Sequence, residues 1–274
     1  MKLIESSVQI IEEKDPYKMI ELAGRTCYRS ENNITKDSAK EFVDRMIKLG
    51  HGAMLEHGTI YLKIDKTEDG HLPPARLYWS DGNHKKYTRV RKHGNSIYVT
   101  TNLRVIVEND RLDDLQYQVE PTEHHEKRIT AKFICDRGVS HEFIRHRVFS
   151  FAQESTRYCN YSKDKFGNEL TFIKPSWGYF KNISYKDAGY FDGDVFESSL
   201  KKAESCYFKL IEKGWKPQQA RAVLPNATKT ELVMTGFESD WERFFKLRCS
   251  GAAHPDAQKL ANKLKELLTN VKNN

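Results

Sequence analysis

The sequence predicts one α+β domain, for three reasons. Stretches with strand-type alternation and stretches with helix-type spacing both occur along the chain. No internal repeat and no low-complexity linker divides it. The 274 residues, 38% of them hydrophobic, suffice for one large domain or two small ones with a substantial core. Because no linker is present, we expect a single domain over residues 1–274.

The chain begins with a strand, two helices and another strand, expected at residues 2–11, 16–28, 36–49 and 59–64. Asp37 or Ser38 stands near the start of the second helix, where capping residues are found. Gly50 and Gly52 then break the chain. Residues 59–64 alternate and are rich in β-forming residues, which predicts a strand.

A turn-rich stretch at residues 65–95 follows, and it predicts an exposed insertion that extends to about residue 128. It contains the turn-forming pairs Asp69-Gly70, Pro73-Pro74 and Asp81-Gly82, and a basic run from His84 to His93. We interpret the basic run as solvated surface rather than a nucleic-acid site, and a polyanion contact stays open.

The remaining elements again mix strands and helices. Strands are expected at residues 96–100, 129–135, 170–173 and 230–235. Helices are expected at residues 103–117 (one or two short ones), 140–147, 195–213, 240–247 and 255–268. The helix before Gly214 is the clearest, because glycine is a common C-terminal cap. Residues 150–161 are expected to form a polar, aromatic loop.

Composition limits the class of protein. No stretch approaches the ~20 apolar residues of a membrane helix, and the N-terminus lacks the apolar core of a signal peptide. We therefore expect a soluble, cytoplasmic protein. Five scattered cysteines without a C-x-x-C pair argue against a disulfide framework and against structural zinc. We predict no metal. The net charge of +7 favours anionic partners such as nucleotides, phosphorylated cofactors or nucleic acid.

The densest group of chemically useful side chains is Arg145–Tyr158, RHRVFSFAQESTRY. Three arginines, a histidine and two serines suit a ligand rich in oxyanions, since guanidinium groups match phosphate oxygens. Arg145 and Arg147 cannot share one helix face, so they should address different groups or different subunits. A surface helix end with ordinary salt bridges is the alternative.

This stretch resembles the motif R-H-R-x-x-S-x-N-E-x-S-x-R-Y of the flavin-dependent thymidylate synthases. The matching residues are Arg145, His146, Arg147, Ser150, Ser155, Arg157 and Tyr158. Ala152 replaces the family's Asn, and Gln153 replaces its Glu, with Glu154 next to it. Further segments that resemble the family are His51–His57, Ala220–Pro225, Thr230-Glu231 and Phe244–Arg248, and Cys135–His141 is similar to a branch with a larger insert.

The resemblance implies a fold with a central, mostly antiparallel sheet flanked by helices. It also implies reductive methylation of dUMP to dTMP with methylenetetrahydrofolate, FAD and NADPH, in homotetramers whose active sites lie between subunits. The flavin would carry the one-carbon unit and the hydride, so the protein would contribute position and charge. The composition of the motif fits that expectation, because it is rich in anion-binding side chains and lacks an obvious pair of nucleophile and base.

The resemblance also implies roles for individual residues. The residues expected to hold FAD are Ala53, Glu56, Arg145, His146, Arg147, Ala152, Gln153, Phe237, Ser239, Arg243 and His254. The residues expected to bind substrate are Glu142, Gln153, Glu154, Ser155, Thr156, Arg157, Arg221 and Arg248. Ser155 and Arg157 would take the dUMP phosphate, with Arg221 arriving from another subunit. Arg248 would face the uracil and act in catalysis by stabilising negative charge that develops on the ring.

Some residues of these segments also have a plain structural interpretation. His57 is equally a ligand near the flavin or a structural histidine, and Tyr158 is expected to pack the loop, as Ser150 could also do. Nothing near Cys159 in the sequence marks it as an activated nucleophile.

Two departures from the family lie at the end of the 230–237 region. Phe237 replaces an Asn and Ser239 replaces an Arg, both of which contact FAD in relatives. With Ala152 and Gln153, this leaves three hypotheses. The enzyme keeps its methylation activity, or it carries out another one-carbon transfer such as hydroxymethylation of a pyrimidine nucleotide. In the third, it is a non-catalytic nucleotide- or nucleic-acid-binding protein, although the interleaved aromatic and basic repeats of single-strand binders are absent.

Overall fold

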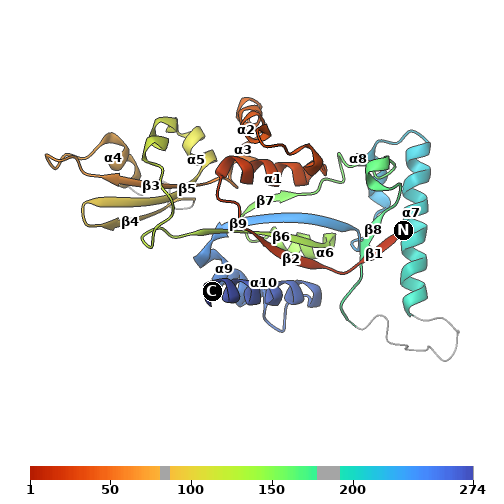
Figure 1. Cartoon of the computed structure of the whole chain (residues 1–274). Helices are drawn as coiled ribbons and strands as arrows, with labels where there is room; N and C mark the ends of the chain where they lie inside the picture. Colours follow the sequence, from red (N-terminus) through yellow and green to blue (C-terminus); the bar gives the residue numbers. More distant parts are fainter. Residues whose placement is uncertain (81–86, 178–191, 274) are drawn as a thin grey trace.

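The computed structural model describes residues 1–80, 87–177 and 192–273 and confirms the α+β class. Figure 1 shows a central sheet between two layers of helices, with a smaller sheet at one end of the molecule and a long upright helix at the other. The central sheet is antiparallel, as expected. Its strands, in spatial order, are β2 (Ser7–Ile11), β6 (Arg128–Asp136), β9 (Lys229–Phe237) and β7 (Ser150–Gln153).

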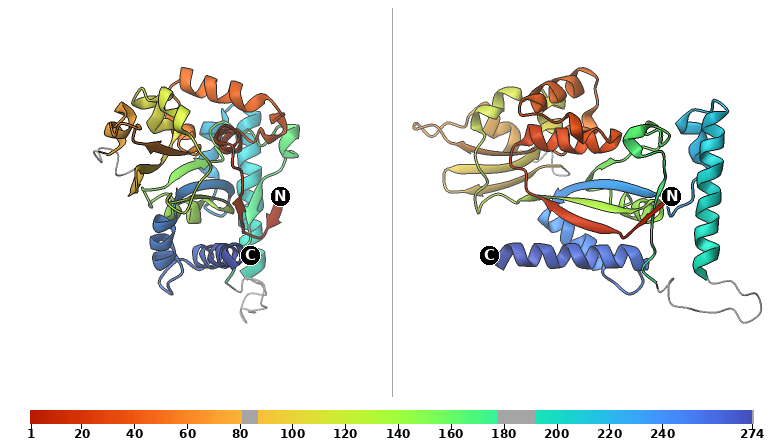
Figure 2. Two further views of the ribbon diagram at one scale, coloured as in Figure 1. Left: turned by 60° about the vertical axis from the view of Figure 1, so that its left-hand side comes forward. Right: turned by 45° about the vertical axis from the view of Figure 1, so that its right-hand side comes forward.

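Helices cover both faces of the central sheet, and for that reason every residue of β9 is buried. The right-hand view of Figure 2 shows the sheet between α1 above and α10 below. The helices on the α1 side are α1 (Pro16–Tyr28), α2 (Ser38–Lys48) and α3 (Gly52–Leu55). Those on the opposite side are α6 (Arg137–Phe143), α9 (Glu238–Arg248) and α10 (Pro255–Asn273).

Helix α1 begins and ends at clear local signals. The Asp15 side chain accepts hydrogen bonds from the backbone N–H groups of Tyr17 and Lys18, and Pro16 is the first helical residue. The helix ends at Arg29, whose backbone is left-handed with a φ of 51°. The Arg29 side chain forms an ion pair with Glu231 of β9.

The predicted insertion adds two strands to the strand that precedes it, and the three form a second, smaller sheet. Its strands, in spatial order, are β3 (Thr59–Asp65), β5 (Ser96–Asn102) and β4 (Arg89–His93). The helices α4 (Pro74–Ser80) and α5 (Leu103–Glu108) and the 3-10 turn η2 (Leu112–Tyr117) pack around it. The expectation of an exposed, turn-rich stretch at 65–95 is wrong for α4, because Trp79 is only 1% exposed and donates to Asp114 at 2.9 Å.

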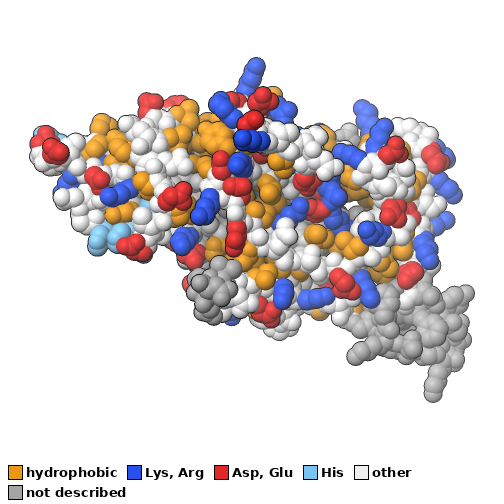
Figure 3. Space-filling view, in the orientation of Figure 1, with side chains coloured by type: hydrophobic (Ala, Val, Ile, Leu, Met, Phe, Trp, Pro, Cys, Tyr) orange, Lys and Arg blue, Asp and Glu red, His pale blue; other side chains and the backbone are white. Residues whose placement is uncertain are grey.

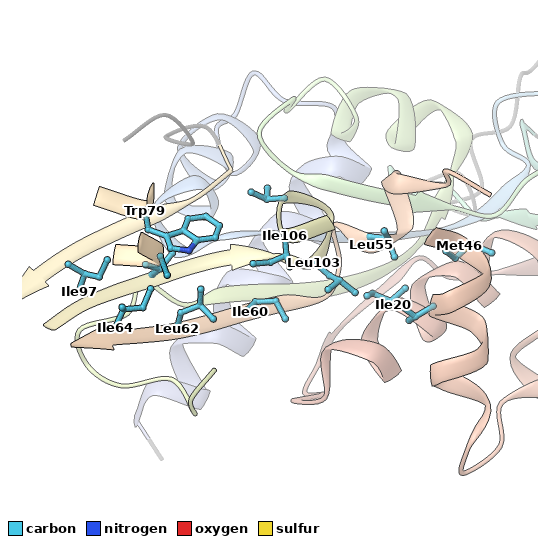
Figure 4. Packing of buried hydrophobic residues seen from close by; sticks show 14 of the residues in the cluster. Ile20, Met46, Leu55, Ile60, Leu62, Ile64, Trp79, Ile97, Leu103 and Ile106 are labelled. Atoms are coloured by element: carbon cyan, nitrogen blue, oxygen red, sulfur yellow. The ribbon is translucent and has the colours of Figure 1, made fainter. Parts of the chain in front are cut away.

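The core of this smaller sheet continues into the helices beside the central sheet. Figure 4 shows Trp79, Ile97 and Ile106 packed in one row with Leu55 of α3 and Ile20 of α1. The insertion is therefore attached by apolar packing. The residues Asp81-Gly82 and the start of the basic run, His84 to Lys86, lie outside the described residues.

Three predicted elements around the central sheet differ from expectation. The single strand predicted at residues 2–11 is two strands in different sheets: β1 (Lys2–Ile4) pairs in parallel with β8 (Thr171–Ile173), and β2 pairs with β6. The expected helix at 140–147 starts at Arg137, because Asp136 caps it with a 2.7 Å hydrogen bond from Val139 N–H. It ends at Phe143. The predicted loop at 150–161 begins instead with strand β7.

The remaining elements lie at the far end of the molecule or in connections. They are α7 (Asp192–Glu212), α8 (Pro217–Ala220) and the 3-10 turns η1 (Glu31–Asn33), η3 (Asp164–Phe166) and η4 (Arg221–Val223). Among the described helices, none combines the length and the apolar composition that crossing a membrane requires.

Candidate functional site

The first part of the arginine-rich motif lies in an exposed turn between α6 and β7. Arg145 and Arg147 are exposed, and no described residue forms a hydrogen bond or ion pair with either side chain. The early end of α6 at Phe143 frees both from the helix. Two guanidinium groups are thus presented to solvent, in the state in which they can bind an anion.

Arg248, Glu142 and His146 form one connected group beside this turn. Arg248 forms an ion pair with the Glu142 carboxylate and donates from Nη2 to the Glu142 backbone carbonyl at 2.6 Å. Its Nε donates to His146 Nε2 at 2.9 Å. Burial and the Arg248 charge lower the pKa of His146 to about 4, so the ring is neutral and can accept that bond. Two neighbours thus hold the guanidinium of the predicted catalytic arginine in one orientation.

Strand β7 separates the next motif residues onto opposite faces of the sheet. Ala152 is 1% exposed and packs under α1 against Ala23 and Val233. Gln153 is on the other face, where its amide donates to Ser140 Oγ at 2.8 Å and to Thr230 Oγ1 at 3.2 Å. Ala152 is therefore covered by α1 in this structure, and its expected contact with a cofactor stays a prediction.

Glu154 does not stand in for the glutamate that is missing at position 153. Its carboxylate is on the α1 face, accepts from Lys229 Nζ at 2.8 Å and from the Tyr161 hydroxyl at 3.1 Å, and the residue is 3% exposed. A shift of one residue along a strand moves a side chain to the opposite face. Glu154 is therefore buried and bonded within the fold, and its expected contact with substrate stays a prediction.

The loop after β7 brings the predicted phosphate-binding residues together within one chain. Arg157 Nε donates to Gln218 Oε1 at 3.2 Å, and Arg221 Nη1 donates to Thr156 Oγ1 at 3.2 Å. The Ser155 backbone N–H is fixed to the Cys27 carbonyl at 3.0 Å. Within the chain, Arg221 contacts the loop of its own chain, and its expected contribution to the site of another subunit stays a prediction. Gln218 carried no sequence signal and was missed.

An exposed pair of tyrosines borders this loop. Tyr158 is 57% exposed and Tyr28 is 41% exposed, and their ring centroids are 5.3 Å apart. The Arg157 guanidinium lies 5.1 Å from the Tyr158 ring. The expectation that Tyr158 packs the loop is wrong, because its ring faces solvent; Tyr28, far away in sequence, was not anticipated.

Charged residues under the loop form a buried network. Glu231 contacts Arg29, Lys229 and Lys132, the last at 2.5 Å. Lys132 also lies 3.7 Å from Glu31. Burial lowers the pKa of Lys229 and of Lys132, and the facing glutamates oppose that shift. The network joins the end of α1 to the central strands β6 and β9.

The second family-like segment, at the end of α3, leads to a buried polar cluster. His57 is fully buried; its Nδ1 lies 2.8 Å from Thr235 Oγ1, and its Nε2 has no partner among the described residues. Burial and the charge of Arg128 lower the pKa of His57 to about 3. Arg128 donates to the Glu56 carbonyl at 2.9 Å and to Ser150 Oγ at 3.1 Å. His57 is therefore a structural histidine, and Ser150 is bonded within the fold.

Glu56 itself reaches a small cavity. Its carboxylate accepts from Arg104 Nη1 at 2.6 Å. A cavity of ≈ 100 Å³ lies beside it, lined by Glu56, Tyr87, Asn102, Arg104, Val105 and Glu108. All of these except Glu56 belong to the insertion. Ala53, on the same short helix, is exposed.

The two departures at the end of β9 are covered by the insertion. Phe237 is 3% exposed, with the guanidinium of Arg89 4.2 Å from its ring centroid and that of Arg128 5.5 Å away. The Ser239 hydroxyl donates to the Glu126 carboxylate at 2.5 Å. Phe237 is therefore closed off from a cofactor in this conformation, and its expected contact with FAD is not supported.

The last predicted residues lie on and after α9. Arg243 is exposed. His254 is half-buried, its ring centroid is 5.4 Å from that of Trp177, and its buried Nδ1 has no partner among the described residues.

The cysteines are free thiols. Burial raises the pKa of Cys159 to about 12 and that of Cys27 to about 11. A thiolate is the nucleophilic form, so neither residue is activated. The site therefore offers fixed cations and hydrogen-bond donors and no activated sulfur.

Comparison with known proteins identifies the family. A family described as "Thymidylate synthase complementing protein" matches residues 9–69 and 116–272. The unmatched stretch between them contains α4, β4, β5 and α5. The chain is similar to proteins named flavin-dependent thymidylate synthase from Geobacter sulfurreducens, Sulfurisphaera tokodaii and Corynebacterium efficiens.

The similarity is moderate in each case. Identity to the Geobacter protein is 30% over 135 residues, which are 49% of this chain and 53% of that protein. For the Sulfurisphaera protein it is 31% over 135 residues, 49% of this chain and 47% of that one. For the Corynebacterium protein it is 28% over 195 residues, 69% and 78%. The chain thus matches about half the length of the first two relatives. Since the family match spans most of the sequence, the chain belongs to the thymidylate synthase complementing protein family.

Proposed function

We propose that this protein is a flavin-dependent thymidylate synthase, which methylates dUMP to dTMP with methylenetetrahydrofolate, FAD and NADPH. The observation that carries the proposal is the loop in which Thr156, Arg157 and Arg221 meet, because it is a ready-made clamp for a nucleotide phosphate. Family membership and the names of the relatives support the reaction.

The residues that the structure leaves available fit an anionic dinucleotide cofactor in part. Arg145 and Arg147 are exposed and lack side-chain partners among the described residues, which suits a diphosphate. Glu56 borders a cavity. Ala152 and Phe237 are covered, so the cofactor would be held by the arginine turn and by Glu56, without those two.

The reaction then divides between cofactor and protein. A bound flavin would supply one-carbon and hydride transfer. The clamp at Arg157 and Arg221 would hold the nucleotide by its phosphate. Arg248, fixed by Glu142 and His146, would place a permanent cation against the pyrimidine, where it would stabilise negative charge that develops on the ring. The neutral His146 accepts a bond from Arg248 and adds no second charge.

We further propose that the active site is completed between subunits of a homotetramer. No hydrogen bond or ion pair among the described residues joins the Arg145–Arg147 turn to the 155–157 loop of the same chain. Apolar side chains flank the turn in exposed positions: Ile144 is 39% exposed, Val148 38% and Leu247 60%. Exposed apolar groups beside unpaired arginines favour a protein partner over solvent.

The absorbance spectrum tests the proposal first. The purified protein is expected to bind FAD and to shift the flavin spectrum when dUMP is added. Release of tritium from C5-labelled dUMP, followed by mass analysis of the product, then distinguishes methylation from hydroxymethylation. A protein that remains colourless with excess FAD would overturn the flavin-dependent reaction.

The nucleic-acid hypothesis has less support. On the face shown in Figure 3, Lys and Arg side chains are interspersed with Asp and Glu along the whole length. Non-specific nucleic-acid binding depends on a continuous basic surface and falls steeply with salt. Titration with single-stranded DNA at two salt concentrations checks this, and tight, salt-sensitive binding would favour the alternative.

A further inference from the structure

A glutamate precedes the predicted phosphate loop. Glu154 is directly followed by Ser155, and its carboxylate is buried beneath the loop rather than solvated. An unneutralised carboxylate there would repel a phosphate dianion, and the low polarity of its surroundings would strengthen the repulsion. The loop can accept phosphate only if this charge is balanced.

Lys229 is the residue that balances it. Its Nζ lies 2.8 Å from Glu154 Oε2, whereas Arg29 Nη1 lies 4.0 Å from the same oxygen. The Tyr161 hydroxyl donates to the other carboxylate oxygen at 3.1 Å. Lys229 is the first residue of β9, and its side chain is 10% exposed, so solvent cations do not easily replace it.

Other cations in the network share Glu231 with Lys229, so Lys229 can also neutralise Glu154. Glu231 also contacts Lys229, and it is shared with Arg29 and Lys132. Three cations and three carboxylates (Arg29, Lys132, Lys229, Glu31, Glu154 and Glu231) therefore balance one another. Removal of one cation leaves a net negative charge in the network, and the carboxylate nearest the lost cation feels it most.

We propose that Lys229 neutralises Glu154 and thereby enables the 155–157 loop to bind the phosphate of a nucleotide monophosphate. The inference rests on the proposed function and deepens it, since it assigns a positioning residue that does not itself contact the ligand. Under this inference, Lys229 acts through its charge rather than its shape. Variants that remove the charge of Lys229, of Glu154 or of both can therefore test it.

The test compares four variants by equilibrium binding of dUMP. Lys229→Met is expected to weaken dUMP binding about tenfold, as one uncompensated nearby charge does. The double variant Lys229→Met with Glu154→Gln removes both charges and is expected to return to within about threefold of wild type. Glu154→Gln alone is expected to bind dUMP at least as tightly as wild type. Lys132→Met, in the same network without direct contact to Glu154, is the matched control and should have the smaller effect.

Each outcome decides between charge and structure. If the double variant binds dUMP as poorly as Lys229→Met, the role of Lys229 is structural and the inference fails. If Lys229→Met does not fold, Glu154→Gln and the double variant still decide, because weaker dUMP binding in both overturns the inference. If wild type binds dUMP and Lys229→Met binds it equally well, the inference about Lys229 fails and the proposed function stands. Wild type that binds no dUMP overturns the proposed function as well.

Discussion

Arg248 connects the geometry of the site most directly to the chemistry. It donates to His146, to the Glu142 carboxylate and to the Glu142 carbonyl, and its side chain is 16% exposed. Replacement with alanine removes all three bonds and the only cation of this group. Because Glu142 is 35% exposed on its side chain, solvent can rehydrate the carboxylate that is left.

The loss of Arg248 is expected to affect turnover more than folding. Loss of a preorganised charge that faces developing negative charge costs about 2.7–4 kcal/mol, or roughly 10²–10³ in kcat. Loss of hydrogen bonds to a half-exposed carboxylate costs about 1–3 kcal/mol of stability. Arg248→Ala is therefore expected to remain folded. Its rate of dTMP formation should drop by roughly two to three orders of magnitude, as the loss of transition-state stabilisation requires. Arg248→Lys keeps the charge without the planar guanidinium, and its turnover should lie between that of wild type and that of Arg248→Ala.

The assay measures dTMP formation under saturating substrate together with the thermal midpoint of unfolding. Lys246→Ala, an exposed residue on the same helix, serves as the control. The pKa of His146 provides an independent readout by NMR, because loss of the Arg248 charge is expected to raise it from about 4. A folded Arg248→Ala enzyme with kcat within about threefold of wild type would refute the electrostatic role.

Three further predictions follow from single contacts. Gln218→Ala removes the acceptor that orients Arg157 and is expected to weaken dUMP binding by about threefold to tenfold in equilibrium dialysis, with little change in stability; unchanged binding would exclude Gln218 from the clamp. His57 has a folded-state pKa of about 3 against an ordinary 6.5, so the folded state resists protonation and loses stability as pH falls below 6.5 toward 3. His57→Gln should reduce the loss of unfolding free energy between pH 7 and pH 5, measured by urea unfolding. An unchanged difference between the two pH values would contradict this prediction. Gly24→Ala places a Cβ 2.4 Å from Phe42 Cζ and is expected to cost about 1–3 kcal/mol in urea unfolding, a loss that a smaller residue at position 42 should reduce.

Local patterns predicted the elements that carry their own signals. Helix α1 has a capping Asp15 and a proline at its first position, and α7 ends before Gly214, so both were recognisable from the sequence. Strand β3 alternates, and it too formed as expected. Helix α4 was not predicted because the turn signals around it outweighed Trp79, whose burial depends on Asp114 and on the strands beneath it.

The motif and the other segments that resemble the family predicted the family to which the chain belongs, and the match over residues 9–69 and 116–272 confirms it. The motif also gives the order of its arginines along the chain. Which of those side chains are available was decided only by the tertiary structure. Arg221 and Thr156 meet across 65 positions of sequence, and Lys229 reaches Glu154 across 75. Sequence spacing describes neighbours along one element, whereas sheet register and helix packing choose the partners of each side chain. For that reason, adjacent residues 153 and 154 have opposite surroundings, and the burial of Ala152 and Phe237 could be seen only in the folded chain.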